Sequence, residues 1–71
     1  MKLCQQFVVE VIYKGWKDQM FTAEQIKYLE TQIQLSAKNA VAFLTNIDTM
    51  PKGLTIDRVE ATYNGDTEIS R

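Results

Sequence analysis

The sequence has no histidine, one cysteine, one proline and three glycines among its 71 residues. A closed structural zinc site needs four Cys or His ligands, which Cys4 alone does not provide. A Ser-His-Asp triad is excluded because histidine is missing, and Cys4 has no His to activate it as a nucleophile. We therefore expect no metal, no cofactor, no catalytic residue and no small-molecule substrate, and we predict that the chain is not an enzyme.

The chain also lacks an excess of charge and a long hydrophobic run. Eight Lys and Arg against nine Asp and Glu leave a net charge of −1, whereas nucleic-acid-binding domains usually carry a basic excess. No segment approaches the roughly 20 apolar residues of a membrane span, and Gln5 and Gln6 interrupt the apolar region that a signal peptide needs. The leading expectation is a cytoplasmic protein with no membrane or nucleic-acid partner.

The composition is that of a folded chain, with 45% hydrophobic and 24% charged residues. We predict a single domain over residues 1–71. A core of this size seldom supplies more than about 3–5 kcal/mol, and small proteins without disulfides or metals often gain stability by oligomerisation. Many domains of about 60 residues do fold alone, so the size leaves a monomer and a homodimer both open.

Alternating apolar residues predict a strand over residues 3–14, and β-branched and aromatic side chains are typical of strands. Glu10 lies in the middle of this apolar run, where it is expected either to guard an exposed strand edge or to pair with a Lys or Arg on a neighbouring strand. Gly15 ends the run. Residues 16–21 are then either a short return strand or a loop that leads into a helix.

Thr22 and Gln25 have the spacing of a capping box, which predicts a helix start. No Gly or Pro follows before Pro51, so we expect a helix over residues 23–46, about 36 Å long. At 100° per residue its apolar side chains form one stripe. The members of the stripe are Ile26, Leu29, Ile33, Ala37, Ala40, Leu44 and Ile47.

A loop over residues 47–53 is predicted to lead into a strand over residues 54–63. Asn64-Gly65 is a hairpin signal, so residues 66–70 are either a final short strand or a frayed tail. The predicted fold class is α+β, a small antiparallel sheet of three to four strands in ββαβ or βαββ order. One long helix packs on one face of this sheet and leaves the other face uncovered.

Two groups of apolar residues are candidates for an interaction surface. Tyr28 and Leu35 are two turns apart on the helix face away from the main stripe, and Trp and Tyr often anchor protein interfaces. Val8, Ile12 and Trp16 lie on or near the expected open sheet face. Together with two neighbouring lysines, the candidate surface is Val8, Ile12, Lys14, Trp16, Lys17, Tyr28 and Leu35.

These features predict a small protein-binding module that acts by contact, as a stoichiometric binder or inhibitor of a larger protein, and that self-associates. Inhibitors from viruses and mobile elements fall in this size range, which is an analogy of size alone. The alternative is a single-stranded nucleic-acid or RNA-binding domain. Its contacts would be stacking and phosphate binding by Tyr13, Lys14, Trp16 and Lys17.

Overall fold

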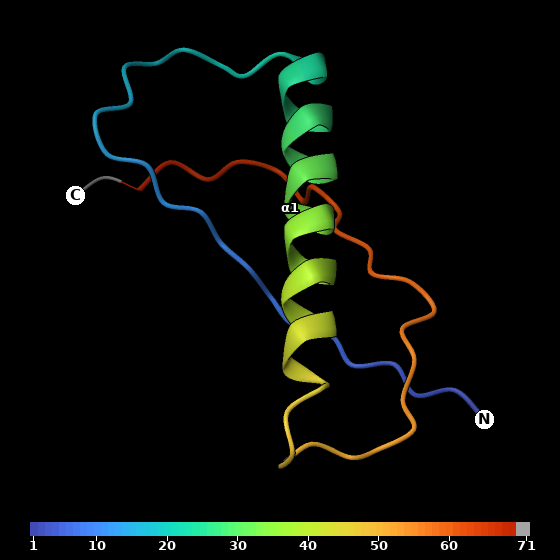
Figure 1. Ribbon diagram of the computed structural model, residues 1–71. Coiled ribbons are helices and arrows are strands. Elements are labelled where there is room, and N and C mark those ends of the chain that lie inside the picture. The colour runs from blue at the N-terminus through green and yellow to red at the C-terminus, as the bar shows by residue number, and fades with distance from the viewer. Residues whose placement is uncertain (70–71) are drawn as a thin grey trace.

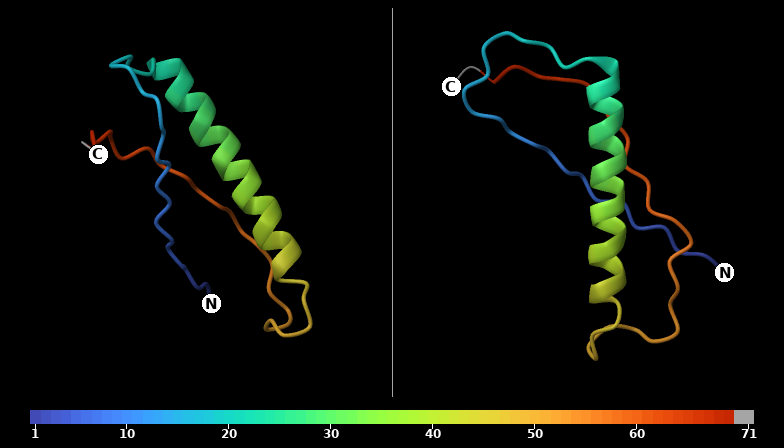
Figure 2. Two further views of the ribbon diagram at one scale, coloured as in Figure 1. Left: turned by 90° about the vertical axis from the view of Figure 1, so that its left-hand side faces the viewer. Right: turned by 45° about the horizontal axis from the view of Figure 1, so that its top comes forward.

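The computed structural model describes residues 1–69, and the helix α1 (Ala23–Leu44) is their one regular element. An extended segment flanks it on each side in the sequence: the N-terminal segment, residues 1–13, and the C-terminal segment, residues 54–69 (Figure 1). Both segments run from the end of α1 toward its beginning in all three views (Figures 1 and 2). They are therefore roughly parallel to each other and opposite in direction to the helix.

The predicted α+β fold is wrong, because the described residues contain neither a strand nor a sheet. The chain is extended over the predicted strands 3–14 and 54–63, but no backbone-to-backbone hydrogen bond joins them in the described part of the chain. The C-terminal residues 66–69 form no strand either, and residue 70 lies outside the described residues. Without a sheet, neither the ββαβ nor the βαββ order applies.

The absence of a return strand after the N-terminal segment explains much of the difference between the predicted sheet and the structure. Residues 16–21 form a loop, because Gly15 and Asp18 adopt positive φ angles of 78° and 61°. Such angles lie in the left-handed region and break an extended backbone. The N-terminal segment therefore has no antiparallel neighbour next to it in sequence, and the next extended segment comes only after the whole length of α1.

The predicted capping box at the helix start is confirmed. The Thr22 side chain accepts a hydrogen bond from the Gln25 backbone N–H at 3.1 Å, and the Gln25 Oε1 atom accepts one from the Thr22 N–H at 2.9 Å. At the other end the Thr45 hydroxyl donates to the Val41 carbonyl at 2.9 Å. Side chains and turns thus provide hydrogen-bond partners for backbone groups at both helix ends. The helix α1 ends at Leu44, two residues before the predicted end at residue 46.

The chain is open for its size. Its radius of gyration is 15.8 Å, whereas a compact domain of this length has about 11 Å. It exposes 7456 Å², and compact monomers of 8.2 kDa expose about 4,500 Å². No side chain is buried in residues 1–69. The half-buried apolar residues are Ile26, Leu29 and Ala37 of α1 and Ile56, Val59 and Ala61 of the C-terminal segment.

We expect Thr22→Ala to weaken α1 by about 1 kcal/mol, because the Gln25 N–H then loses its side-chain acceptor. The loss is measured as reduced helical circular dichroism. Thr31→Ala is the matched control, since the Thr31 hydroxyl donates to the Lys27 carbonyl inside the helix and not at its end. Alanine favours helix interiors, so this control should keep or raise helicity. Equal losses in both variants would contradict the capping role.

Candidate protein-interaction surface

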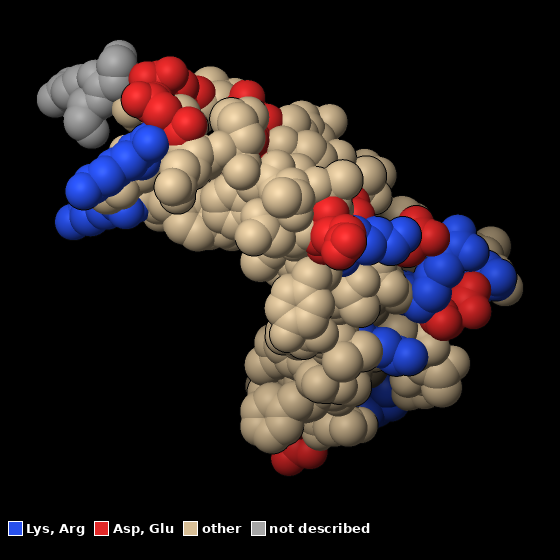
Figure 3. Space-filling model, turned by 90° about the horizontal axis from the view of Figure 1, so that it is seen from above, with Lys and Arg blue, Asp and Glu red and all other residues tan. Residues whose placement is uncertain are grey.

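An open cleft lies between the N-terminal segment, the C-terminal segment and one face of α1. Its lining is mainly apolar and comes from all three parts of the chain. Lys, Arg, Asp and Glu gather in patches and leave wide areas of the surface without charge (Figure 3). The cleft is thus a place where apolar side chains from distant parts of the sequence face the same open space. They include Phe7, Val9, Ile26, Leu29, Ile33 and Ile56.

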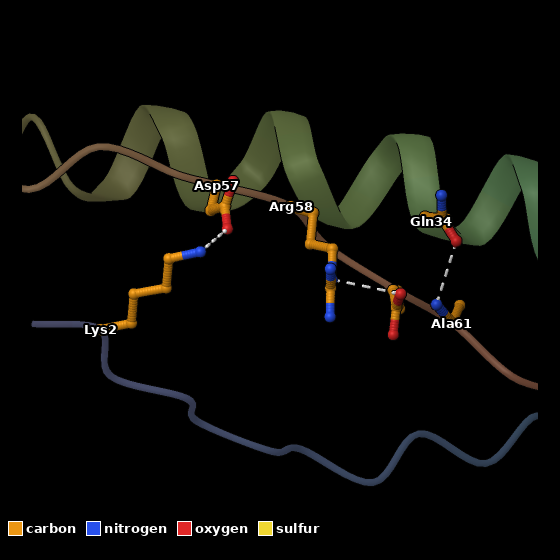
Figure 4. Close-up of polar contacts among 6 residues, drawn as sticks. Lys2, Gln34, Asp57, Arg58 and Ala61 are labelled. Carbon is orange, nitrogen blue, oxygen red and sulfur yellow. Dashed lines mark hydrogen bonds and ion pairs between the residues drawn. The ribbon is translucent and has the colours of Figure 1, made fainter.

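Two side chains of α1 hold the C-terminal segment along one wall of the cleft. The Ala61 N–H donates to Gln34 Oε1 at 3.2 Å, and the Tyr63 N–H donates to Glu30 Oε2 at 2.6 Å; Figure 4 shows the first of these contacts. Four helical residues rise about 6 Å, and two extended residues span about 6.6 Å. Acceptors four apart on the helix therefore match alternate N–H groups of the C-terminal segment.

The N-terminal segment has weaker ties. The Lys2 ammonium pairs with the Asp57 carboxylate at 2.9 Å (Figure 4), and both side chains are exposed, so this ion pair contributes about 0–1 kcal/mol. At the other end of the segment the rings of Tyr13 and Phe21 lie 5.5 Å apart between centroids. Between these two contacts, Phe7 is 79% exposed and Val8 is 92% exposed.

The candidate residues from the sequence lie on two separate surfaces. Tyr28 and Leu35 lie on the face of α1 opposite the half-buried stripe and are 66% and 55% exposed. Val8 and Ile12 belong to the N-terminal segment and line the cleft, as do Lys14 and Trp16 from the turn that follows it. Lys17 comes after that turn and is exposed. The structure therefore does not gather the seven residues into one patch, and their role in binding stays a prediction.

Aromatic residues near the turn already have partners within the chain. The Trp16 indole N–H donates to the Gln19 carbonyl at 2.8 Å, and Tyr13 packs at a tilt of 41° against Phe21. Lys14 and Lys17 are exposed beside them. None of these contacts favours nucleic-acid stacking over a local packing role, so the nucleic-acid alternative stays a prediction.

Glu30 and Gln34 were not identified from the sequence as hydrogen-bond acceptors for another segment. The sequence does carry a signal for this acceptor role, since both residues lie at the edge of the apolar stripe and are four residues apart. Polar groups at that edge can reach the backbone of whatever covers the stripe. The pairing of Lys2 with Asp57 had no signal, because it joins residues 55 positions apart.

Few features of the described residues suggest chemistry. Cys4 is exposed and unbridged, and no group of three His, Cys, Asp or Glu in residues 1–69 is placed to hold a metal ion. The only helix of that stretch is not long and apolar enough to cross a membrane.

No family model, curated protein or solved structure matches the chain significantly. Its function therefore has to be inferred from its surface.

Gln34→Ala tests the tie between α1 and the C-terminal segment. Removing one neutral hydrogen bond costs about 1 kcal/mol, so we expect the Ala61 amide proton to exchange with solvent about fivefold faster by NMR. Gln32→Ala is the matched control, because Gln32 lies on the same helix and makes no such contact. Unchanged Ala61 exchange in Gln34→Ala would show that this hydrogen bond does not hold the segment.

Tyr63 offers a pH-dependent probe of the C-terminal segment. Its hydroxyl donates to Asp66 Oδ1 at 2.6 Å, and this hydrogen bond, followed by desolvation and the carboxylate charge, raises the pKa of Tyr63 above 10.0. Because the pKa is raised, the contact between Tyr63 and Asp66 stabilises the folded chain at pH values below the ordinary tyrosine pKa. This stabilisation is lost as pH rises through the raised pKa.

We expect Asp66→Ala to lower the pKa of Tyr63, measured by the ultraviolet absorbance of tyrosinate. Tyr63→Phe identifies which of the three tyrosine titrations belongs to this residue. Glu68→Ala is the control, since it removes a nearby carboxylate that does not accept the phenol hydrogen bond. The same Tyr63 titration in Asp66→Ala and wild type would refute the contact.

Proposed function

We propose that this chain is a non-enzymatic protein-binding module that acts by contact, as a stoichiometric binder or inhibitor, and that it closes its apolar cleft against a protein. One observation carries the proposal. The chain exposes 7456 Å², about 2,900 Å² more than a compact monomer of its mass. An interface of standard size removes only about 800 Å² from each partner, so the excess is ample for binding.

The exposed side chains make this surface costly to leave in water. Burying one large apolar side chain contributes about 1.5–3 kcal/mol, and monomers rarely expose contiguous apolar patches beyond a few hundred Å². In this chain large apolar side chains of the N-terminal segment stay in solvent, among them Leu3, Phe7, Val9 and Ile12. Contact with another protein recovers the free energy that the chain alone does not gain.

A protein fits this surface better than a charged ligand does. The cleft lining is mainly apolar, and the net charge is −1, which gives no long-range attraction for a polyanion. Apolar contact surfaces with aromatic anchors are typical of protein interfaces. A cytoplasmic setting belongs to the same proposal, because the lone Cys4 is free and reduced thiols are the rule there.

Phe7→Asp tests the proposal without changing a buried residue. Phe7 is 79% exposed, so the isolated chain should keep its helical circular dichroism, while binding of any protein at the cleft falls at least tenfold. Gln5→Asp is the matched control, because it adds the same charge two residues away without removing apolar area. Binding is measured as self-association by sedimentation and as stoichiometric capture of proteins from the host lysate.

The outcomes separate clearly. Loss of association or capture in Phe7→Asp, with both retained in Gln5→Asp, supports an apolar contact surface. A wild-type chain that stays monomeric, captures nothing and unfolds cooperatively as a compact monomer would refute the proposal. Its radius of gyration in solution would then be near 11 Å, well below the 15.8 Å found here.

A further inference from the structure

The backbone of residues 2–10 is unpartnered. Within the described part of the chain, no backbone N–H or carbonyl of these residues takes part in a hydrogen bond, and their one polar contact is made by the Lys2 side chain. An extended segment with free N–H and carbonyl groups is a template for pairing with another extended chain. Its side chains alternate between two faces, so one register of pairing suits them better than its neighbours.

We propose that residues 2–10 bind the same residues of a second copy of this chain, as an antiparallel ribbon between molecules centred on Gln6. The inference rests on the proposed function and names its partner. Nothing in it requires a sheet within one chain, since both halves of the ribbon come from separate molecules. A two-fold axis through Gln6 makes the contact identical for both copies.

Charge complementarity selects this register. Lys2 and Glu10 carry opposite charges, and each lies four residues from Gln6. In an antiparallel pair centred on Gln6, Lys2 of each copy therefore stands opposite Glu10 of the other, and opposite charges across a strand pair are stabilising. Glu10 has no ion-pair partner within residues 1–69, and Lys2 has only the exposed pair with Asp57.

Two apolar pairs fit the same register. Leu3 then faces Val9 on one face of the ribbon, and Cys4 faces Val8 on the other, while Gln5 faces Phe7 and Gln6 faces the Gln6 of the other copy. A shift of one residue toward either end, to a centre at Gln5 or Phe7, puts Glu10 out of line with Lys2. These matches involve one segment and its own copy, which favours a second copy over an unrelated protein.

The exposed area supports a dimer as well. A standard interface takes about 800 Å² from each partner, and the chain exposes about 2,900 Å² beyond a compact monomer. In the ribbon, Leu3, Phe7 and Val9 of both copies lie on one face. The same three residues line the open cleft of their own copy, so the ribbon would extend this apolar wall with the three residues of the second copy.

Disulfide trapping tests the register directly, in the full-length chain with Cys4→Ser. Gln6→Cys in this background places two thiols opposite each other at the centre of the ribbon, and we expect rapid formation of a covalent dimer on mild oxidation. Val8→Cys is the matched control in the same background. Its two thiols are about 13 Å apart along the ribbon, beyond the roughly 7 Å Cα separation that a disulfide spans.

A third variant removes the remaining ambiguity. Val8→Cys with Cys4 retained places Cys4 of one copy opposite the new thiol of the other, and we expect it to cross-link. Wild-type Cys4 alone should not, because its own copy lies four residues out of register. Cross-linking of Val8→Cys in the Cys4→Ser background would indicate a parallel pairing or an antiparallel pairing with another centre, and either would overturn the proposal, as would failure of Gln6→Cys to cross-link.

Charge reversal tests the pairing without oxidation. Each dimer contains two Lys2–Glu10 pairs, so we expect Glu10→Lys to raise the dimer dissociation constant about tenfold, measured by sedimentation equilibrium. Adding Lys2→Glu should restore most of the affinity, although it also reverses the charge that faces Asp57. No rescue, or an unchanged constant in Glu10→Lys, would refute the register.

Failure of this inference is distinct from failure of the proposed function. A chain that stays monomeric but captures another protein in a Phe7-dependent manner overturns the dimer and leaves the contact function intact. A dimer without the predicted cross-links overturns the ribbon and leaves self-association through another surface, which the proposed function allows. A compact monomer that captures nothing overturns both.

Discussion

The backbone groups of the two extended segments need hydrogen-bond partners, and the structure depends on how this need is met. An extended chain has no partners of its own, unlike a helix, in which the backbone pairs with itself. The capping box of α1 completes the helix locally. The C-terminal segment finds acceptors on α1, and the N-terminal segment finds none among the described residues.

The helix α1 therefore positions the C-terminal segment but not the N-terminal segment. Glu30 and Gln34 stand at a spacing that matches alternate N–H groups of the C-terminal segment, and the half-buried residues Ile26, Leu29 and Ala37 lie along the same side. A single helix of 22 residues offers one such side. The opposite side of α1, with Tyr28 and Leu35, stays in solvent, and so does most of the N-terminal segment.

The unpaired backbone and the exposed apolar side chains are the basis of the proposed function. A chain of 71 residues has little apolar surface to spare if it folds alone, because small domains bury only about 60% of the surface that the unfolded chain exposes. Here the exposed area is far above that of a compact monomer. Apolar residues that would form the core of a larger domain stay exposed here, and in the proposed function a partner protein covers them.

The sequence by itself determined the local features of this protein. It located the start of α1, since a capping box needs only Thr22 and Gln25, and it indicated that a chain of 71 residues has a small core. It also predicted strands from alternation, and there it was wrong, because alternation shows that a segment can pair and not that a neighbour is present. The tertiary structure decided which segments found partners. The positive φ angles at Gly15 and Asp18 removed the return strand, and the acceptors of α1 lie beside only one of the two extended segments, because such pairing depends on residues far apart in the chain.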